Sequence, residues 1–130
     1  MKVIKGIYAL CFELKTDLNI RDWNLTKGKY VYVGSAQNNL LKRVKRHIKK
    51  NKKKHWHIDY LTTLNECVIK EVFYLEKKKL FEDVISFIVG IYGDSINNFG
   101  ASDSKYNSHL FRVKDFNFLE KYMFILNNND

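Results

Sequence analysis

Apolar residues follow two different periods along the chain. Short runs rich in β-branched and aromatic residues indicate strands, whereas apolar residues spaced three and four apart indicate helices. Predicted strands span residues 3–14, 29–33, 67–75 and 109–113. Predicted helices span residues 38–50, 55–64, 79–92 and 115–126. This order predicts one α+β domain over residues 1–130, with a small, mainly antiparallel three-stranded central sheet and helices packed on it.

The composition is typical of a globular protein. Of its 130 residues, 45% are hydrophobic, and no apolar run reaches the about 18 residues that a membrane span needs. Lys5 and Glu13 interrupt the apolar segment near the N-terminus, so we expect neither a signal peptide nor a membrane span. Cys11 and Cys67 lie in apolar runs, as core residues do. A cytoplasmic location is therefore expected.

Positive charge is concentrated in one segment. Lysine and arginine number 23 against 14 acidic residues, a net charge of +9. Nine cations and no acid lie between residues 42 and 54: Lys42, Arg43, Lys45, Arg46, Lys49, Lys50, Lys52, Lys53 and Lys54. Like charges at helical spacing repel each other, which favours an anionic partner. We expect nucleic acid, bound through counterion release, and no membrane, because the segment lacks a bulky apolar face.

Two tripeptides stand in the first two predicted strands, Gly6-Ile7-Tyr8 and Tyr32-Val33-Gly34. Arg43 and His47 follow one turn apart in the next predicted helix, and Glu82 lies near the start of a later one. In order and spacing, these residues resemble the signatures of the GIY-YIG nuclease superfamily. The resemblance extends over about residues 5–113.

Two further segments, HWHIDYL at 55–61 and FGASDSKYNSHLF at 99–111, are similar to the Uri-type branch of that superfamily. This branch is a small domain found alone or attached to endonuclease III-type glycosylases. Relatives often carry two cysteines in the second segment, where this chain has Ser104 and Tyr106. A metal or disulfide role for that pair is therefore not expected here.

The resemblance implies a metal-dependent endonuclease that hydrolyses phosphodiester bonds in DNA, or in RNA, with a role in DNA repair and a repair-protein partner. The implied catalytic residues are Tyr8, Tyr32, Arg43, His47 and Glu82. Glu82 would hold one Mg²⁺ or Mn²⁺, which needs few protein carboxylates because Mg²⁺ keeps several waters. Arg43 would hold the scissile phosphate through its planar fork. One tyrosine would be the general base, and the resemblance favours Tyr32.

Several assignments have alternatives. Asp83 competes with Glu82 for the metal, and Tyr30 shares the strand face of Tyr32. Trp56 either stacks on an unpaired base or packs in the core. Gly34 and Ser35 would let the backbone approach a phosphate. The expected nucleic-acid contacts are therefore Gly34, Ser35 and Trp56, together with the lysines and Arg46 of the segment between residues 42 and 54.

The remaining polar residues of the two branch-specific segments form a possible additional site: His55, His57, Asp59, Ser102, Asp103 and His109. Three interpretations stay open for the histidines: a zinc site, a role in binding or catalysis, and structural hydrogen bonding. For the whole chain, the alternative to a nuclease is a catalytically inactive nucleic-acid-binding module on the same fold.

Overall fold

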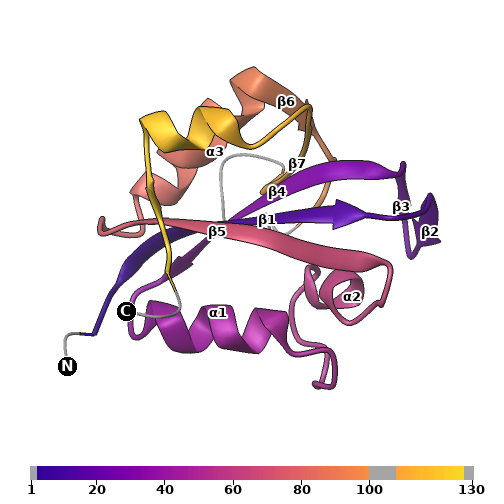
Figure 1. Cartoon of the computed structure of the whole chain (residues 1–130), viewed down its shortest axis with the longest axis horizontal. Coiled ribbons are helices and arrows are strands. Elements are labelled where there is room, and N and C mark those ends of the chain that lie inside the picture. Colours follow the sequence, from indigo (N-terminus) through magenta and orange to yellow (C-terminus); the bar gives the residue numbers. More distant parts are fainter. Residues whose placement is uncertain (1–2, 100–107, 128–130) are drawn as a thin grey trace.

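Residues 3–99 and 108–127 are described by the structure, a computed structural model, and six of their strands form one antiparallel sheet (Figure 1). These strands are β1 (Gly6–Leu14), β4 (Gly28–Ala36), β5 (Cys67–Leu75), β6 (Gly93–Ser95), β7 (Leu110–Val113) and β8 (Phe124–Ile125), in the order β6-β7-β4-β1-β5-β8. The α+β class agrees with the prediction, but the prediction of a three-stranded sheet was wrong. The short strands β6, β7 and β8 extend the sheet on both sides of its long central strands.

Three α-helices cover the two faces of the sheet: α1 (Leu40–Ile48), α2 (Asp59–Thr62) and α3 (Phe81–Tyr92). Helices α1 and α2 lie on one face, and α3 lies on the other (Figure 1). The Asn39 side chain caps α1 by accepting a hydrogen bond of 3.0 Å from the Lys42 amide. No helix among the described residues is long and apolar enough to cross a membrane.

Strands β1 and β4 are mostly apolar and buried because both faces of the sheet are covered there, whereas β5 carries the exposed Lys70 and Glu71. In β1, the alternate residues Tyr8 and Leu10 join a core cluster with α1 and α2, whereas Ile7 and Ala9 join a second cluster with α3. On α3, the stripe that contains Ile85 packs on the sheet while other apolar side chains stay exposed. Apolar composition alone therefore overstated how much of this helix is buried.

The last segment does not form the helix predicted over residues 115–126. It forms a 3-10 turn, η1 (Asn117–Lys121), and then β8, whose Phe124 pairs with Tyr74 of β5. Buried residues of this segment, such as Phe116 and Leu119, have helical spacing, but the open edge of β5 offers backbone hydrogen bonds. Another unpredicted element is a separate hairpin, β2 (Leu18–Ile20) with β3 (Trp23–Leu25), between β1 and β4.

One edge of β4 is left open near its end. Strand β7 pairs with β4 only over Lys29–Tyr32, and the Val33 amide still donates a hydrogen bond to the His109 carbonyl. Beyond this point, β7 does not cover Gly34 and Ser35. Side chains from both faces of the sheet can therefore meet at this edge.

Candidate active site

A polar pocket of about 410 Å³ lies at this open edge of β4. Its lining comes from β4, α1, the loop before α2, the start of α3 and the residue before β7. The lining residues are Tyr32, Gly34, Ser35, Arg43, His55, Trp56, His57, Lys79, Glu82 and His109. The fold thus brings together residues that are up to 77 positions apart in the sequence.

Three of the five expected catalytic residues line this pocket: Tyr32, Arg43 and Glu82. The Glu82 side chain is only 12% exposed, and its Oε1 lies 3.9 Å from Nε2 of His109. The alternative carboxylate, Asp83, is not among the lining residues. The geometry therefore favours Glu82 over Asp83 as the acidic member of the site.

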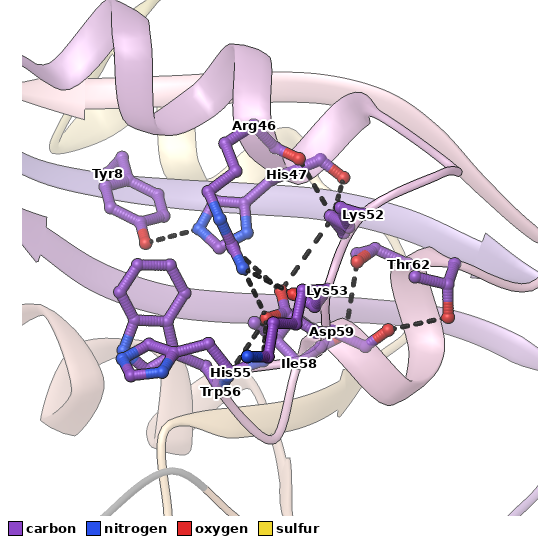
Figure 2. Close-up of polar contacts among 11 residues, drawn as sticks. Tyr8, Arg46, His47, Lys52, Lys53, His55, Trp56, Ile58, Asp59 and Thr62 are labelled. Carbon is purple, nitrogen blue, oxygen red and sulfur yellow. Dashed lines mark hydrogen bonds and ion pairs between the residues drawn. The ribbon is translucent and has the colours of Figure 1, made fainter.

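Tyr8 and His47, the other two expected residues, form a buried pair next to the pocket. The Tyr8 hydroxyl lies 2.7 Å from His47 Nε2, and either atom can be the donor (Figure 2). Burial lowers the pKa of His47 to about 3, and the nearby Lys52 acts in the same direction. Burial raises the pKa of Tyr8 although the Arg43 guanidinium opposes this. Both groups are therefore neutral at physiological pH.

Tyr32 and Tyr8 lie diagonally across the two strands rather than directly opposite. In the register of β1 and β4, Tyr8 is opposite Gly34 and Tyr32 is opposite Leu10. The centres of the two phenol rings are therefore 6.5 Å apart. Burial raises the pKa of Tyr32 well above its usual value, and the neighbouring Tyr8 and Glu82 add to the effect. A phenolate at Tyr32 therefore needs additional positive charge beside it.

Tyr30 has a structural role. Its ring stacks on Phe12 at 5.6 Å, and its hydroxyl donates a hydrogen bond of 2.6 Å to the Thr26 carbonyl. The side chain is fully buried and does not line the pocket. Tyr30 is thus a suitable control for Tyr32.

Gly34 provides room for the Tyr8 phenol. A Cβ atom built at Gly34 would overlap the end of the Tyr8 ring. Tyr8 fills much of the space freed by the missing side chain, and Gly34 also lines the pocket, so close approach of a phosphate to its backbone stays a prediction. The glycine acts on the site by letting Tyr8 reach His47.

Gly34→Ala is expected to lower the free energy of unfolding by about 1–3 kcal/mol, because the added methyl group must displace a buried ring. Gly90→Ala is the control. Its Cβ would meet Phe111 at an ordinary 3.4 Å, and alanine favours the helical conformation of α3. Urea unfolding of both variants checks this. A destabilisation by Gly90→Ala as large as that by Gly34→Ala would contradict it.

Arg43 is held from two sides at the pocket wall. Its Nη1 donates a hydrogen bond of 3.2 Å to the Ser35 carbonyl, and its Cζ lies 4.5 Å from the centre of the Trp56 ring. Arg46 Cζ lies at the same distance from this ring. In the structure, the Trp56 ring packs against both guanidinium groups. A base could stack on this ring only if Arg43 or Arg46 moved away from it.

Asp59 organises the loop that carries His55 and Trp56 (Figure 2). Its carboxylate accepts two hydrogen bonds from Arg46, of 3.1 and 2.9 Å. It also accepts hydrogen bonds from the backbone amides of His55 (2.8 Å) and Trp56 (2.9 Å). Lys52 Nζ lies 3.8 Å away. Asp59 is fully buried and does not line the pocket, so it supports the site from behind.

The Asp59 carboxylate is expected to contribute stability that depends on pH. Burial alone would raise its pKa, but the hydrogen bonds from Arg46 and from two amides outweigh burial and lower the pKa to about 2. The contribution of this carboxylate to the free energy of unfolding is therefore complete above its unfolded-state pKa of about 4. It is lost as the pH falls through about 2. Asp59→Asn should cost about 3–5 kcal/mol at pH 7, because it removes one partner of a buried ion pair. This difference from wild type should shrink below a pH of about 4.

Urea unfolding between pH 2 and 7 measures this difference. Asp22→Asn, at an exposed acid, is the control and should change stability by less than about 0.5 kcal/mol. A cost for Asp59→Asn that stays constant across the acid range would contradict the assignment.

Three of the expected nucleic-acid-binding cations, Arg46, Lys50 and Lys52, form hydrogen bonds within the protein, although Lys50 itself is exposed. Arg46 pairs with Asp59, as described above. Lys50 Nζ donates hydrogen bonds of 2.6 Å to the carbonyls of Leu64 and Cys67. Lys52 Nζ donates to the carbonyls of Arg46 and His47 at 2.9 and 2.8 Å. The other expected lysines, Lys42, Lys45, Lys49, Lys53 and Lys54, are exposed, and their contact with nucleic acid stays a prediction.

The histidines of the possible additional site separate into two environments. His57 packs against Trp23 at 4.9 Å, and burial, with Arg21 nearby, lowers its pKa. His109 is buried beside Glu82, whereas His55 is exposed. All three line the pocket, but no group of three or more His, Cys, Asp or Glu residues in the described chain is arranged to hold a metal. Ser102 and Asp103 lie outside the described residues.

The lining contains one cation that the sequence interpretation did not select. Lys79 lies just before α3 and faces the pocket. It belongs to a run of three lysines, 77–79, directly ahead of that helix. This run was the signal that could have identified it.

Fold and pocket together define an α+β protein with a polar site, lined by Arg43, Lys79 and Glu82 among others, at the edge of an antiparallel sheet. The chain belongs to the family described as domain of unknown function DUF123, whose model matches residues 7–127. The matched range includes every residue that lines the pocket. A search of curated proteins and a search of solved structures found no match.

Proposed function

We propose that this protein is a metal-dependent endonuclease of the GIY-YIG type, in the Uri-type branch, that hydrolyses phosphodiester bonds. The observation that carries the proposal is the meeting of Tyr32, Arg43 and Glu82 in one pocket. A phenol, a guanidinium and a carboxylate are the groups that this hydrolysis uses. The sequence resemblance described above supports the same assignment.

In the proposed reaction, a water molecule attacks phosphorus and the bond to one ester oxygen breaks. Tyr32 would first lose its phenol proton to solvent, and the resulting phenolate would accept the proton of the attacking water. The leaving ester oxygen would take a proton from solvent, and Arg43 would stabilise the charge that develops on the phosphoryl oxygens. Glu82 would hold one Mg²⁺ or Mn²⁺. A single carboxylate with low exposure fits a hard cation that retains several waters. Such an ion supplies positive charge for the phosphate and for ionisation of a nearby phenol.

The Tyr8–His47 pair would orient the site rather than move protons. A histidine with a pKa of about 3 is too weak a base to remove the proton of a buried phenol. Tyr8 also does not line the pocket, whereas Tyr32 does. These two observations favour Tyr32 as the general base.

The proposed substrate is DNA. RNA is the alternative substrate, because its strands are joined by the same phosphodiester bonds. The exposed lysines Lys42 and Lys45 lie three residues apart on α1, and Lys49, also exposed, follows directly after its last residue. Together they place positive charge along this part of the chain. A cytoplasmic location and a repair-protein partner belong to the same proposal.

A second candidate is a nucleic-acid-binding module without catalysis. The raised pKa values of both Tyr8 and Tyr32 favour it, because these phenols stay protonated unless positive charge is supplied. Incubation with branched, nicked, single-stranded and RNA substrates, with Mg²⁺, Mn²⁺ or a chelator, separates the two candidates. Metal-dependent cleavage of any substrate supports the nuclease, and binding without cleavage of all of them supports the module.

A further inference from the structure

Three consecutive lysines form the turn between β5 and α3. Lys77, Lys78 and Lys79 are all exposed, and Lys79 lines the pocket. The turn thus places a second group of cations at the pocket, separate in sequence from the segment between residues 42 and 54. The positive lining of the site does not come from α1 alone.

Hydrogen bonds fix the position of this turn relative to β4. The Gln37 side-chain amide donates to Ser35 Oγ at 2.8 Å and to the Lys77 carbonyl at 3.2 Å. The Lys77 amide donates to the Leu75 carbonyl, and the Glu82 amide donates to the Lys79 carbonyl, both at 2.9 Å. The backbone that carries the lysines is therefore held at a defined place beside Ser35, another residue of the pocket.

The two groups of cations reach the pocket from different faces of the sheet. Arg43 comes from α1 on one face, whereas Lys79 directly precedes α3 on the other (Figure 1). A nucleic-acid strand carries one negative charge per nucleotide, so a strand with one phosphate on Arg43 brings its neighbouring phosphates to the pocket rim. Lysine is a suitable ligand there because its flexible ammonium acts as a point charge.

We propose that the Lys77–Lys79 turn is a second phosphate-binding site, which holds a backbone phosphate adjacent to the scissile one. Lys79 lines the pocket, and the adjacent exposed lysines Lys77 and Lys78 add positive charge to the same turn. The identity of the ligand, a phosphodiester backbone, rests on the proposed function. The role of the turn is to bind and position the strand, and it takes no part in the chemical step.

The test compares two triple variants with equal loss of charge. K77Q/K78Q/K79Q removes the turn cations, and K70Q/K114Q/K121Q removes three exposed lysines that do not line the pocket. Affinity for a fluorescent single strand and a duplex is measured by anisotropy at several salt concentrations. The turn variant should bind about tenfold more weakly, with a salt slope smaller by roughly one or more. The control should stay within about twofold of wild type, because non-contacting cations contribute little at physiological salt.

Cleavage kinetics provide a second readout. The turn variant should raise KM while kcat stays within about threefold, because phosphate binding away from the scissile bond acts mainly on substrate affinity. K79Q alone should account for most of the KM change. Thermal unfolding should be unchanged in both triple variants, since all of the replaced side chains are exposed.

The outcomes separate this inference from the proposed function. Binding by wild type without cleavage, combined with weaker binding by the turn variant, would reject the nuclease and retain the phosphate site. Wild-type affinity and salt slope in the turn variant would overturn the phosphate site even if the protein is a nuclease. Equal losses in the two triple variants, or no binding by wild type, would also overturn it.

Discussion

Glu82→Gln is expected to reduce metal-dependent cleavage by about 1000-fold, equivalent to ~4 kcal/mol of transition-state stabilisation. Glutamine keeps the size of the side chain but removes the negative charge that would hold the divalent ion. Nucleic-acid affinity should stay within about threefold, because Arg43 and the exposed lysines remain. Single-turnover cleavage and anisotropy on the same oligonucleotide measure the two effects separately.

Asp83→Asn is the matched control for this experiment. Asp83 is the next residue on α3 and also carries a carboxylate, but it does not line the pocket. Its replacement should leave the cleavage rate within about twofold of wild type, as for a surface substitution away from the site. Loss of cleavage with Asp83→Asn and retention with Glu82→Gln would show that the wrong carboxylate has been assigned.

Arg43→Lys should slow cleavage by about 100-fold, a loss of roughly 2.7 kcal/mol, while binding remains nearly normal. Lysine keeps the charge but cannot hold the Ser35 carbonyl and present a planar pair of N–H donors to a phosphate at the same time. It also loses the stacking of the guanidinium on Trp56. A measured kcat equal to that of wild type would remove Arg43 from the proposed mechanism.

Tyr32→Phe belongs to the same prediction and should also cost about 100-fold in kcat, because general-base catalysis contributes about 10²–10⁴-fold. Tyr30→Phe is the control. It removes the hydrogen bond to the Thr26 carbonyl and should cost about 1 kcal/mol of stability with little change in kcat. Equal losses of activity in both variants would mean that the hydroxyl of Tyr32 has no special role.

The long strands and helices were predictable because the spacing of their apolar residues matches the faces that they bury. The strand Cys67–Leu75 matches its predicted range, and α1 lies within the predicted 38–50. The four-residue strand Leu110–Val113 lies within its predicted range 109–113, but strands of two or three residues, such as Gly93–Ser95, carry too little pattern to be identified. The closing segment failed for a different reason. Its apolar spacing suits a helix, but the edge of β5 provides backbone partners that no local pattern reveals.

The candidate site was predictable as a set of residues but not as a geometry. Tyr32, Arg43 and Glu82 could be selected from the signature spacing, and they do meet in the pocket. The roles of Arg46, Lys50 and Lys52 could not be separated from those of their neighbours, because a uniform run of cations does not show which carbonyls and carboxylates lie nearby. Arg46 and Lys50 find their partners at Asp59, Leu64 and Cys67, more than ten residues further along the chain. Lys52 instead bonds back to carbonyls near the end of α1.

The buried Asp59 carboxylate ties two backbone amides of the pocket wall to α1 and α2. Hydrogen–deuterium exchange of these amides should therefore depend on the stability of both helices. The amides of His55 and Trp56 donate to one oxygen of this side chain, which also receives a hydrogen bond from Arg46 of α1. These amide protons can exchange only when the carboxylate separates from them, and this leaves a buried charge without its partners. We therefore expect the loop that carries His55 and Trp56 to open together with its contacts to α1 and α2, so that the amides of His55 and Trp56 exchange slowly.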